Sequence, residues 1–171
     1  KVWQPISNKD FKNSFSEMPW LDRENAMDAL SNSNQFKAFA GPLRTKLKQW
    51  PDNGYLILEN FFDVKLIDNV NEEVEKLIKE EKVGFNFTGK KIMFAFKQSA
   101  AVDKVFRDTK LIELLEFILG KKVKPFQTIN FIYGSEQKAH SDSIHMSTQP
   151  PGYLIAVWVA LEDVKQGSGE L

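Results

Sequence analysis

The residues best suited to metal chemistry lie in one short segment, Gln137–His145, which contains both histidines of the chain. His140 and Asp142 stand two positions apart, and side chains alternate faces along an extended strand. In a strand, this imidazole and this carboxylate therefore lie on the same face. They would supply two of the three ligands of the facial triad that holds Fe(II) with open positions. The spacing predicts part of an iron site; a surface histidine and aspartate in a loop is the alternative.

The second histidine is placed less favourably for metal binding. His145 is separated from His140 by an odd number of positions, so it faces away in a regular strand, and only a β-bulge would turn it toward the metal. Two apolar runs, Phe126–Tyr133 and Tyr153–Leu161, flank the histidine segment. Polar ligands held at the mouth of an apolar barrel are typical of sheltered iron sites.

The periodicity of apolar residues predicts helices first and strands later. Asp22, Ser33 or Asn34, and Asp63 are the predicted helix N-caps, and Gly120 is the predicted end of a helix. The predicted helices are Arg23–Leu30, Gln35–Trp50 with a break near Gly41-Pro42, a long helix after Asp63, Asp103–Arg107 and Lys110–Leu119. The predicted strands are Tyr55–Leu58, Lys91–Lys97, Phe126–Tyr133 and Tyr153–Leu161. This order favours an α+β fold with helices packed outside a β sandwich or barrel.

The long helix has a charged face opposite its apolar one. We predict that this face is solvated, with a partner surface as the alternative. Its residues are Glu72, Glu73, Glu75, Lys76, Lys79 and Glu80.

Composition excludes several classes of function. The chain has 171 residues, with 23 Lys+Arg against 23 Asp+Glu, so its charge predicts neither nucleic acid nor an anionic membrane as partner. It has no cysteine, which rules out disulfides and thiolate chemistry. We see no apolar run of membrane-spanning length and no signal-like start, and we predict a cytoplasmic location.

Several motifs in order resemble the phytanoyl-CoA dioxygenase family, which includes ectoine hydroxylase. The resemblance covers about residues 50–171, and residues 1–49 are predicted to be a helical N-terminal extension. The motifs are Gly54–Phe62, Gln127–Phe131 with Gly134, His140–Asp142, Leu154–Val164 and Gly167–Leu171.

The resemblance implies a double-stranded β-helix (jelly roll) and an Fe(II)- and 2-oxoglutarate-dependent oxygenase that uses molecular oxygen on a small organic or acyl substrate. His140 and Asp142 match the family's metal ligands. Gln127 and Asn130 match strand positions that contact 2-oxoglutarate, with strand-edge hydrogen bonding as the alternative. Trp158 matches an aromatic residue of that pocket, with core packing as the alternative.

A lysine of an earlier strand often helps to hold the co-substrate in this family. Lys97 is our candidate and Lys91 the other choice, while a solvated strand end is the alternative for Lys97. His145, Ser147 and Thr148 are predicted substrate contacts in the loop before the last strand.

The family's second metal histidine and its 2-oxoglutarate arginine come from strands after Gly167–Leu171. A jelly roll needs about eight strands, so we expect the polypeptide to continue beyond residue 171. The alternatives are a non-catalytic jelly-roll binding protein that has lost the metal, and a cupin-like isomerase on a similar barrel. Substrate identity and oligomeric state are not readable from the sequence.

Overall fold

The computed structural model describes residues 18–83, 91–132, 140, 142, 146 and 148–167. The chain divides into two compact units. Unit 1 holds the described residues within Lys1–Ile57, Leu115–Lys122 and Ser141–Ala156. Unit 2 holds those within Leu58–Leu114, Val123–His140 and Val157–Leu171.

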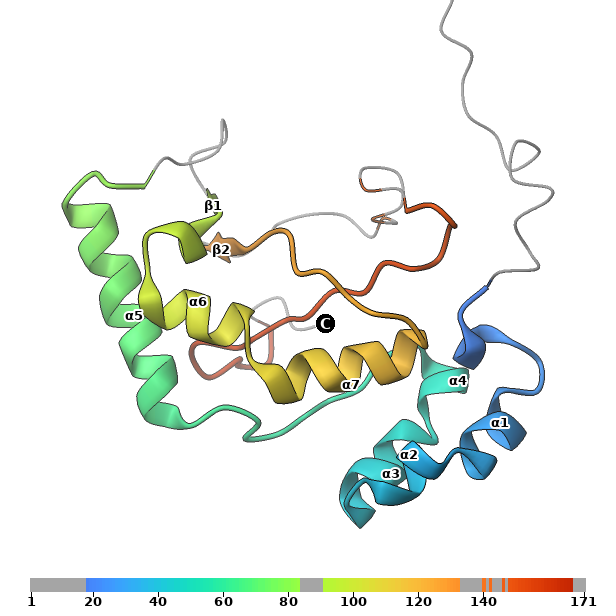
Figure 1. Ribbon diagram of the computed structural model, residues 1–171. Helices are drawn as coiled ribbons and strands as arrows, with labels where there is room; N and C mark the ends of the chain where they lie inside the picture. The colour runs from blue at the N-terminus through green and yellow to red at the C-terminus, as the bar shows by residue number, and fades with distance from the viewer. Residues whose placement is uncertain are drawn as a thin grey trace, which may run out of the picture. The chain divides into compact units, whose positions relative to one another are not determined.

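Unit 1 is built from short helices near the start of the chain (Figure 1). Ser33 caps α2 as predicted, because its side chain accepts a hydrogen bond from the Phe36 amide at 3.2 Å. The predicted break near Gly41-Pro42 is confirmed, since α2 and α3 are separate there. The elements are η3 (Trp20–Asp22), α1 (Ala26–Asn32), α2 (Asn34–Ala38), α3 (Gly41–Leu47) and α4 (Trp50–Asn53).

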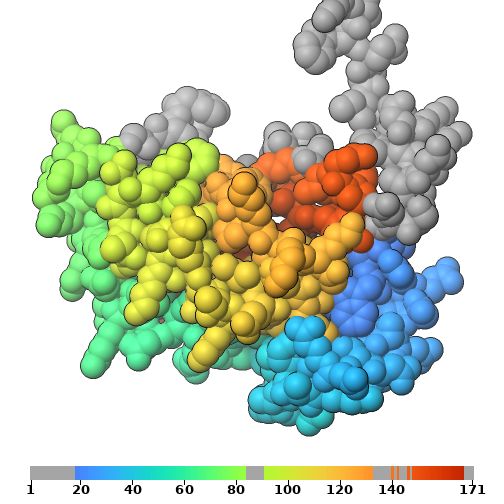
Figure 2. Space-filling view, in the orientation of Figure 1, coloured from blue at the N-terminus to red at the C-terminus, as the bar shows by residue number. Residues whose placement is uncertain are grey.

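An aromatic cluster joins the start of unit 1 to the end of helix α7 (Thr109–Leu119). The Trp20 indole donates a hydrogen bond of 2.7 Å to the Phe117 carbonyl. The Phe117 ring also lies edge-on to both Trp20, at 5.2 Å between centroids, and Phe39, at 4.9 Å. In Figure 2, the blue surface around η3 adjoins the orange surface at the end of α7.

Gly120 ends α7 as predicted, with a φ of 68° in the left-handed region. A Cβ atom at this position would lie 2.7 Å from Cδ1 of Trp20, which is closer than real contacts allow. The lack of a side chain at Gly120 therefore both allows the left-handed end of α7 and leaves room for the Trp20 ring.

We expect Gly120→Ala to lower the free energy of unfolding by more than the ~1–2 kcal/mol that a left-handed conformation costs. Gly54→Ala is the matched control, because Gly54 has a φ of 72° but nothing within 4 Å of its missing Cβ. Urea denaturation of both variants measures the difference. An equal loss of stability in the two variants would show that the Trp20 ring moves aside at no cost in free energy.

Unit 2 contains the long helix, a two-stranded sheet and a short helix (Figure 1). Asp63 caps the long helix as predicted, accepting a hydrogen bond from the Lys65 amide at 2.7 Å. The first residues of α7, as far as Leu114, also belong to this unit. The elements are α5 (Val64–Lys79), β1 (Lys91–Met93), η4 (Ala95–Lys97), α6 (Ala100–Phe106) and β2 (Ile129–Phe131).

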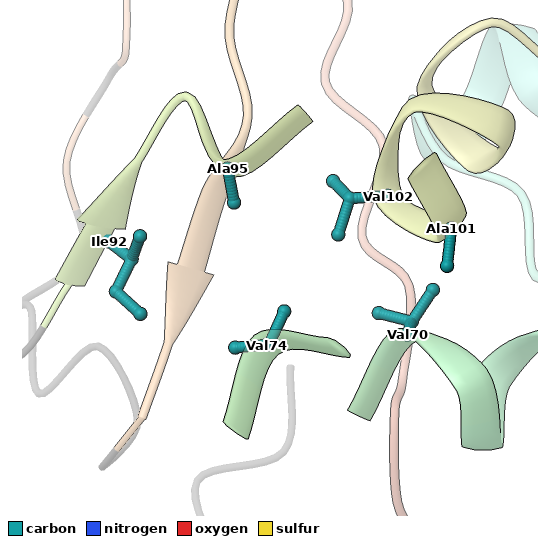
Figure 3. Packing of buried hydrophobic residues seen from close by; sticks show 6 residues of the cluster. All are labelled: Val70, Val74, Ile92, Ala95, Ala101 and Val102. Atoms are coloured by element: carbon teal, nitrogen blue, oxygen red, sulfur yellow. The ribbon is translucent and has the colours of Figure 1, made fainter. Parts of the chain in front are cut away.

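The core of unit 2 lies between α5, the sheet and α6. Side chains from α5, β1, η4 and α6 point toward one another there (Figure 3). Burial of such aliphatic groups is the main favourable term in folding. The buried members are Val70, Val74, Ile92, Ala95, Ala101 and Val102.

One acidic residue of α5 departs from the predicted solvated face. The Glu73 carboxylate accepts hydrogen bonds from the Ser99 hydroxyl at 2.6 Å and from the Ala101 amide at 3.1 Å. The Ser99 hydroxyl in turn accepts from the Val102 amide at 3.0 Å and caps α6. Glu73 therefore fastens α5 to the first turn of α6, whereas Glu72 and Glu75 are exposed as predicted.

This bonding lowers the pKa of Glu73 below its usual value of 4.5, chiefly through the Ser99 hydroxyl and with help from backbone amides. A lowered carboxyl pKa adds stability above the unfolded-state pKa, and that stability is lost as pH falls through the folded-state value. We expect Glu73→Gln to lower stability by about 1 kcal/mol at pH 7 and to flatten the acid decline of the melting temperature.

Glu72→Gln, on the exposed face of the same helix, is the control for that experiment. Thermal melts of both variants between neutral and acid pH measure the effect. If the two variants and the parent chain shared one pH profile, the Glu73 bonds would contribute nothing to folding.

The sheet is smaller than predicted. Among the described residues it consists of β1 and β2, paired antiparallel with Ile92 opposite Asn130. The predicted strand Lys91–Lys97 stops at Met93, because Phe94 has a left-handed φ of 60° and starts the 3₁₀ turn η4.

Two further predicted strands, Tyr55–Leu58 and Tyr153–Leu161, are wrong, since neither has strand structure. A strand requires a paired neighbour, and β-propensity reports only how side chains fit a pleated surface. The described residues thus contain both helices and a small sheet, with helices dominant, and they do not confirm the predicted jelly roll. No helix in the described ranges has the length and apolar character to cross a membrane.

Candidate functional site

One face of the β1–β2 pair gathers a cation and two aromatic rings. Lys91 is directly opposite Phe131 in the register, and cross-strand partners point to the same face. The Lys91 ammonium lies 4.9 Å from the Phe131 ring centroid. The Phe131 ring stacks on Trp158, with centroids 5.0 Å apart and planes 9° apart. These three side chains, hereafter the Lys91 face, combine one positive charge with a flat apolar wall.

The structure also places Trp158 at the surface of its unit. Its side chain is 57% exposed, although one face of the ring is covered by Phe131. A large exposed aromatic residue suits recognition of a ligand better than it suits the core.

Buried polar atoms lie on the other side of the same strand. Asn130 is opposite Ile92, which is fully buried in the core of unit 2. Its Oδ1 atom and the Thr128 Oγ1 atom are buried and have no hydrogen-bond partner among the described residues. Unpaired buried polar atoms are uncommon in folded proteins, so each calls for a partner.

Gln127 and Asn130, the two predicted co-substrate contacts of this strand, are three positions apart. Adjacent side chains of a strand point to opposite faces. Asn130 is adjacent to Phe131, so it points away from the Lys91 face. Gln127 is half-buried and precedes the paired residues Ile129–Phe131.

Lys97 does not lie on a strand. It is the last residue of η4, is exposed, and holds its ammonium 4.8 Å from the Phe94 ring centroid. Lys91, the other lysine considered from the sequence, is the one on β1. In β1, Ile92 is buried and Lys91 and Met93 are half-buried. This alternation of burial marks Lys91, and not Lys97, as a strand residue.

The predicted metal pair is divided between the two units: His140 belongs to unit 2 and Asp142 to unit 1. Both are exposed within the described structure. Their roles as ligands stay a prediction. No group of three or more histidine, aspartate or glutamate side chains able to hold a metal occurs among the described residues.

The predicted substrate loop is described only in part. His145 and Ser147 lie outside the described residues. Thr148 is half-buried, and its hydroxyl accepts a hydrogen bond from the Tyr153 amide at 3.2 Å. That bond closes a turn within unit 1, and the predicted contact of Thr148 with substrate is untested.

Sequence reasoning missed Phe131 and Thr128. Phe131 read as an ordinary apolar strand residue, and only the register shows that it connects Lys91 to Trp158. Thr128 gave no signal, because a threonine in a strand is common.

Comparison with known proteins gives one result. The model of the phytanoyl-CoA dioxygenase (PhyH) family matches residues 50–170. Searches of curated proteins and of solved structures found no match. The family match begins before α5 and includes β1, β2 and the His140 segment. Since it spans well over half of the chain, the chain belongs to the phytanoyl-CoA dioxygenase family.

Proposed function

We propose that this chain is part of an Fe(II)- and 2-oxoglutarate-dependent dioxygenase that hydroxylates a small organic or acyl substrate. Family membership supports the reaction class. The Lys91 face is the main structural support for a co-substrate site, because it presents a cation and an aromatic wall within the residues that match the family. We retain residues 50–171 as the catalytic region and 1–49 as an extension.

The donor chemistry of the His140 segment fits the implied metal. His140 and Asp142 would hold Fe(II), since a neutral imidazole and a carboxylate are two of the ligand types that non-haem iron takes. A further histidine is expected from outside the described residues. When bound, iron and 2-oxoglutarate supply the oxidising power for the hydroxylation.

The chain's own residues bind and orient the co-substrate. The Lys91 ammonium would pair with the carboxylate of 2-oxoglutarate that is remote from the metal, as a charge-assisted hydrogen bond. Trp158 and Phe131 would cover that pair and keep water away, which strengthens the electrostatic attraction. Lys91 replaces Lys97 as our candidate because β1 places it opposite Phe131, which stacks on Trp158, whereas Lys97 lies in η4.

The unpaired atoms of Thr128 and Asn130 supply a second fit. The Thr128 hydroxyl can donate a hydrogen bond to a carboxylate, whereas the unpaired Asn130 Oδ1 atom only accepts and needs a donor such as a bound water. Both lie on the strand face opposite to Lys91, so Thr128 would serve a different carboxylate from the one at Lys91. Gln127 keeps its predicted role in holding the co-substrate.

Conversion of 2-oxoglutarate to succinate tests the proposed function. The full-length protein is supplied with Fe(II), 2-oxoglutarate and air, and succinate is measured with and without a chelator. We expect succinate that depends on iron and oxygen. Stoichiometric binding of Fe(II) without any succinate formation would favour the non-catalytic binding protein.

A further inference from the structure

Two polar side chains of β2 lie on the face of the strand that is turned toward the core of unit 2. Thr128 and Asn130 are two positions apart, so they share one face of the strand. Asn130 is opposite Ile92, which is fully buried, and Ile132, two positions further along, packs against the core cluster. Apolar side chains are the usual residues on such a face, and polar ones there need partners.

This polar pair lies where the two-stranded ladder ends. The Thr128 carbonyl accepts a hydrogen bond of 2.9 Å from the Phe94 amide, which extends the register one pair beyond Met93 and Ile129. Phe94 has its left-handed φ of 60° at this point, and the chain turns into η4. Strained backbone of this kind clusters at sites that hold a ligand. Thr128 is therefore held by its backbone, while its hydroxyl takes no part in the ladder.

Two oxygens of the pair are buried without a partner. Neither Thr128 Oγ1 nor Asn130 Oδ1 has a hydrogen bond to any group in the part of the chain that the structure describes. Such an atom has lost its contact with bulk water without gaining a bond in return, which is costly to the fold. Ordered water is a common partner of such atoms in folded proteins, and it is held where two or more polar groups converge.

The chemistry of the two oxygens limits what can bind to both. The amide oxygen of Asn130 only accepts, so a carboxylate could bond to the Thr128 hydroxyl but not to Asn130 Oδ1. A calcium or magnesium ion fits poorly, because it needs about six oxygen ligands and the pair offers two neutral ones. A water molecule has two O–H groups, which is one donor for each oxygen.

We propose that one ordered water molecule bridges the side chains of Thr128 and Asn130, donating one hydrogen bond to Thr128 Oγ1 and the other to Asn130 Oδ1. Residues two positions apart on a strand are about 6.6 Å apart, and two oxygens bonded to one water are about 4.5 Å apart. Side chains that lean toward each other cover this difference. The Thr128 O–H stays free to donate to a carboxylate, so the bridge is compatible with the proposed function and does not depend on it.

A crystal structure of the full-length protein, at a resolution where single waters are ordered, tests the bridge directly. Crystals are grown with and without 2-oxoglutarate. We expect one water within about 3.2 Å of both oxygens in both crystals. Two separate waters, a protein group or a carboxylate of 2-oxoglutarate at these oxygens would overturn the proposal, as would oxygens that contact nothing.

Thr128→Val keeps the shape of the side chain and removes the hydroxyl. The water then loses one of its two acceptors, so the melting temperature should fall by about 2–4 °C. A hydroxyl without a partner would give the opposite sign, because its removal ends a desolvation cost. An unchanged or raised melting temperature, measured by calorimetry, would therefore refute the bridge.

Asn130→Leu and the double variant complete a cycle that shows whether the partner is shared. Once one side of the bridge is gone, the second substitution removes less, so the double variant should lose less than the sum of the single losses. Thr128→Val combined with Ile129→Val is the control, because Ile129 points to the other face of β2 and its effect should add. Additive losses in both cycles would mean separate partners and would contradict the shared water.

Discussion

Asp142→Ala is expected to lower iron-dependent succinate formation by at least about 100-fold in the full-length protein. The carboxylate is the only anionic ligand in the proposed set, so its loss leaves neutral imidazoles and water to hold a divalent cation. Both Fe(II) affinity and turnover should fall together. Iron binding, measured by titration, and succinate, measured by chromatography, check the two effects separately.

Asp163→Ala is the matched control for that variant. Asp163 is exposed and lies in the same family-matched region, but it carries no proposed role. It should leave succinate formation within the error of the assay. Undiminished turnover by Asp142→Ala would refute the assignment of the metal ligand.

Lys91→Met is expected to raise the KM for 2-oxoglutarate by about 10- to 100-fold. Methionine keeps the length and apolar stem of lysine and removes the ammonium, and a hydrogen bond to a charged group contributes ~1.5–3 kcal/mol. At saturating co-substrate, kcat should change little, because the ammonium would bind the carboxylate remote from the reacting end. Steady-state kinetics over a range of 2-oxoglutarate concentrations measure both constants.

Lys97→Met distinguishes the two lysines. Lys97 is exposed at the end of η4 with its ammonium over Phe94, so its loss should leave the KM for 2-oxoglutarate unchanged. An increase in KM with Lys97→Met and none with Lys91→Met would reverse our assignment and restore the choice made from the sequence.

Three helix boundaries were predicted correctly from the sequence: Ser33, Asp63 and Gly120 each act where they were expected to, because a cap is a local interaction between a side chain or a φ angle and the adjacent turn. The predicted cap Asp22 was wrong, since it lies in η3 and the helix α1 begins only at Ala26, after Asn25. The start of α6 at Ala100 was missed, although its cap is also local: the Ser99 hydroxyl accepts from the Val102 amide.

The strands were predicted poorly for the opposite reason. Strand pairing depends on residues distant in the sequence. An apolar run such as Tyr153–Leu161 therefore shows only that its side chains would fit a strand, not that a partner strand pairs with it. Phe94 illustrates the point: a β-forming residue in the middle of a predicted strand adopts a left-handed conformation and ends it.

Spacing and the family resemblance single out His140, Asp142 and Trp158, but they do not give the geometry of a site. The roles of these residues stay predictions. The choice of Lys91 over Lys97 required the register with Phe131, which no local pattern predicts.

Anaerobic titration of the full-length protein with Fe(II) and 2-oxoglutarate tests the central claim most directly. A 2-oxoglutarate bound to Fe(II) through its keto acid end gives a visible charge-transfer band. We predict that this band appears only when both components are present, and that it is lost in Asp142→Ala. Absence of the band in the parent protein, at concentrations where Fe(II) binding is complete, would contradict the oxygenase assignment.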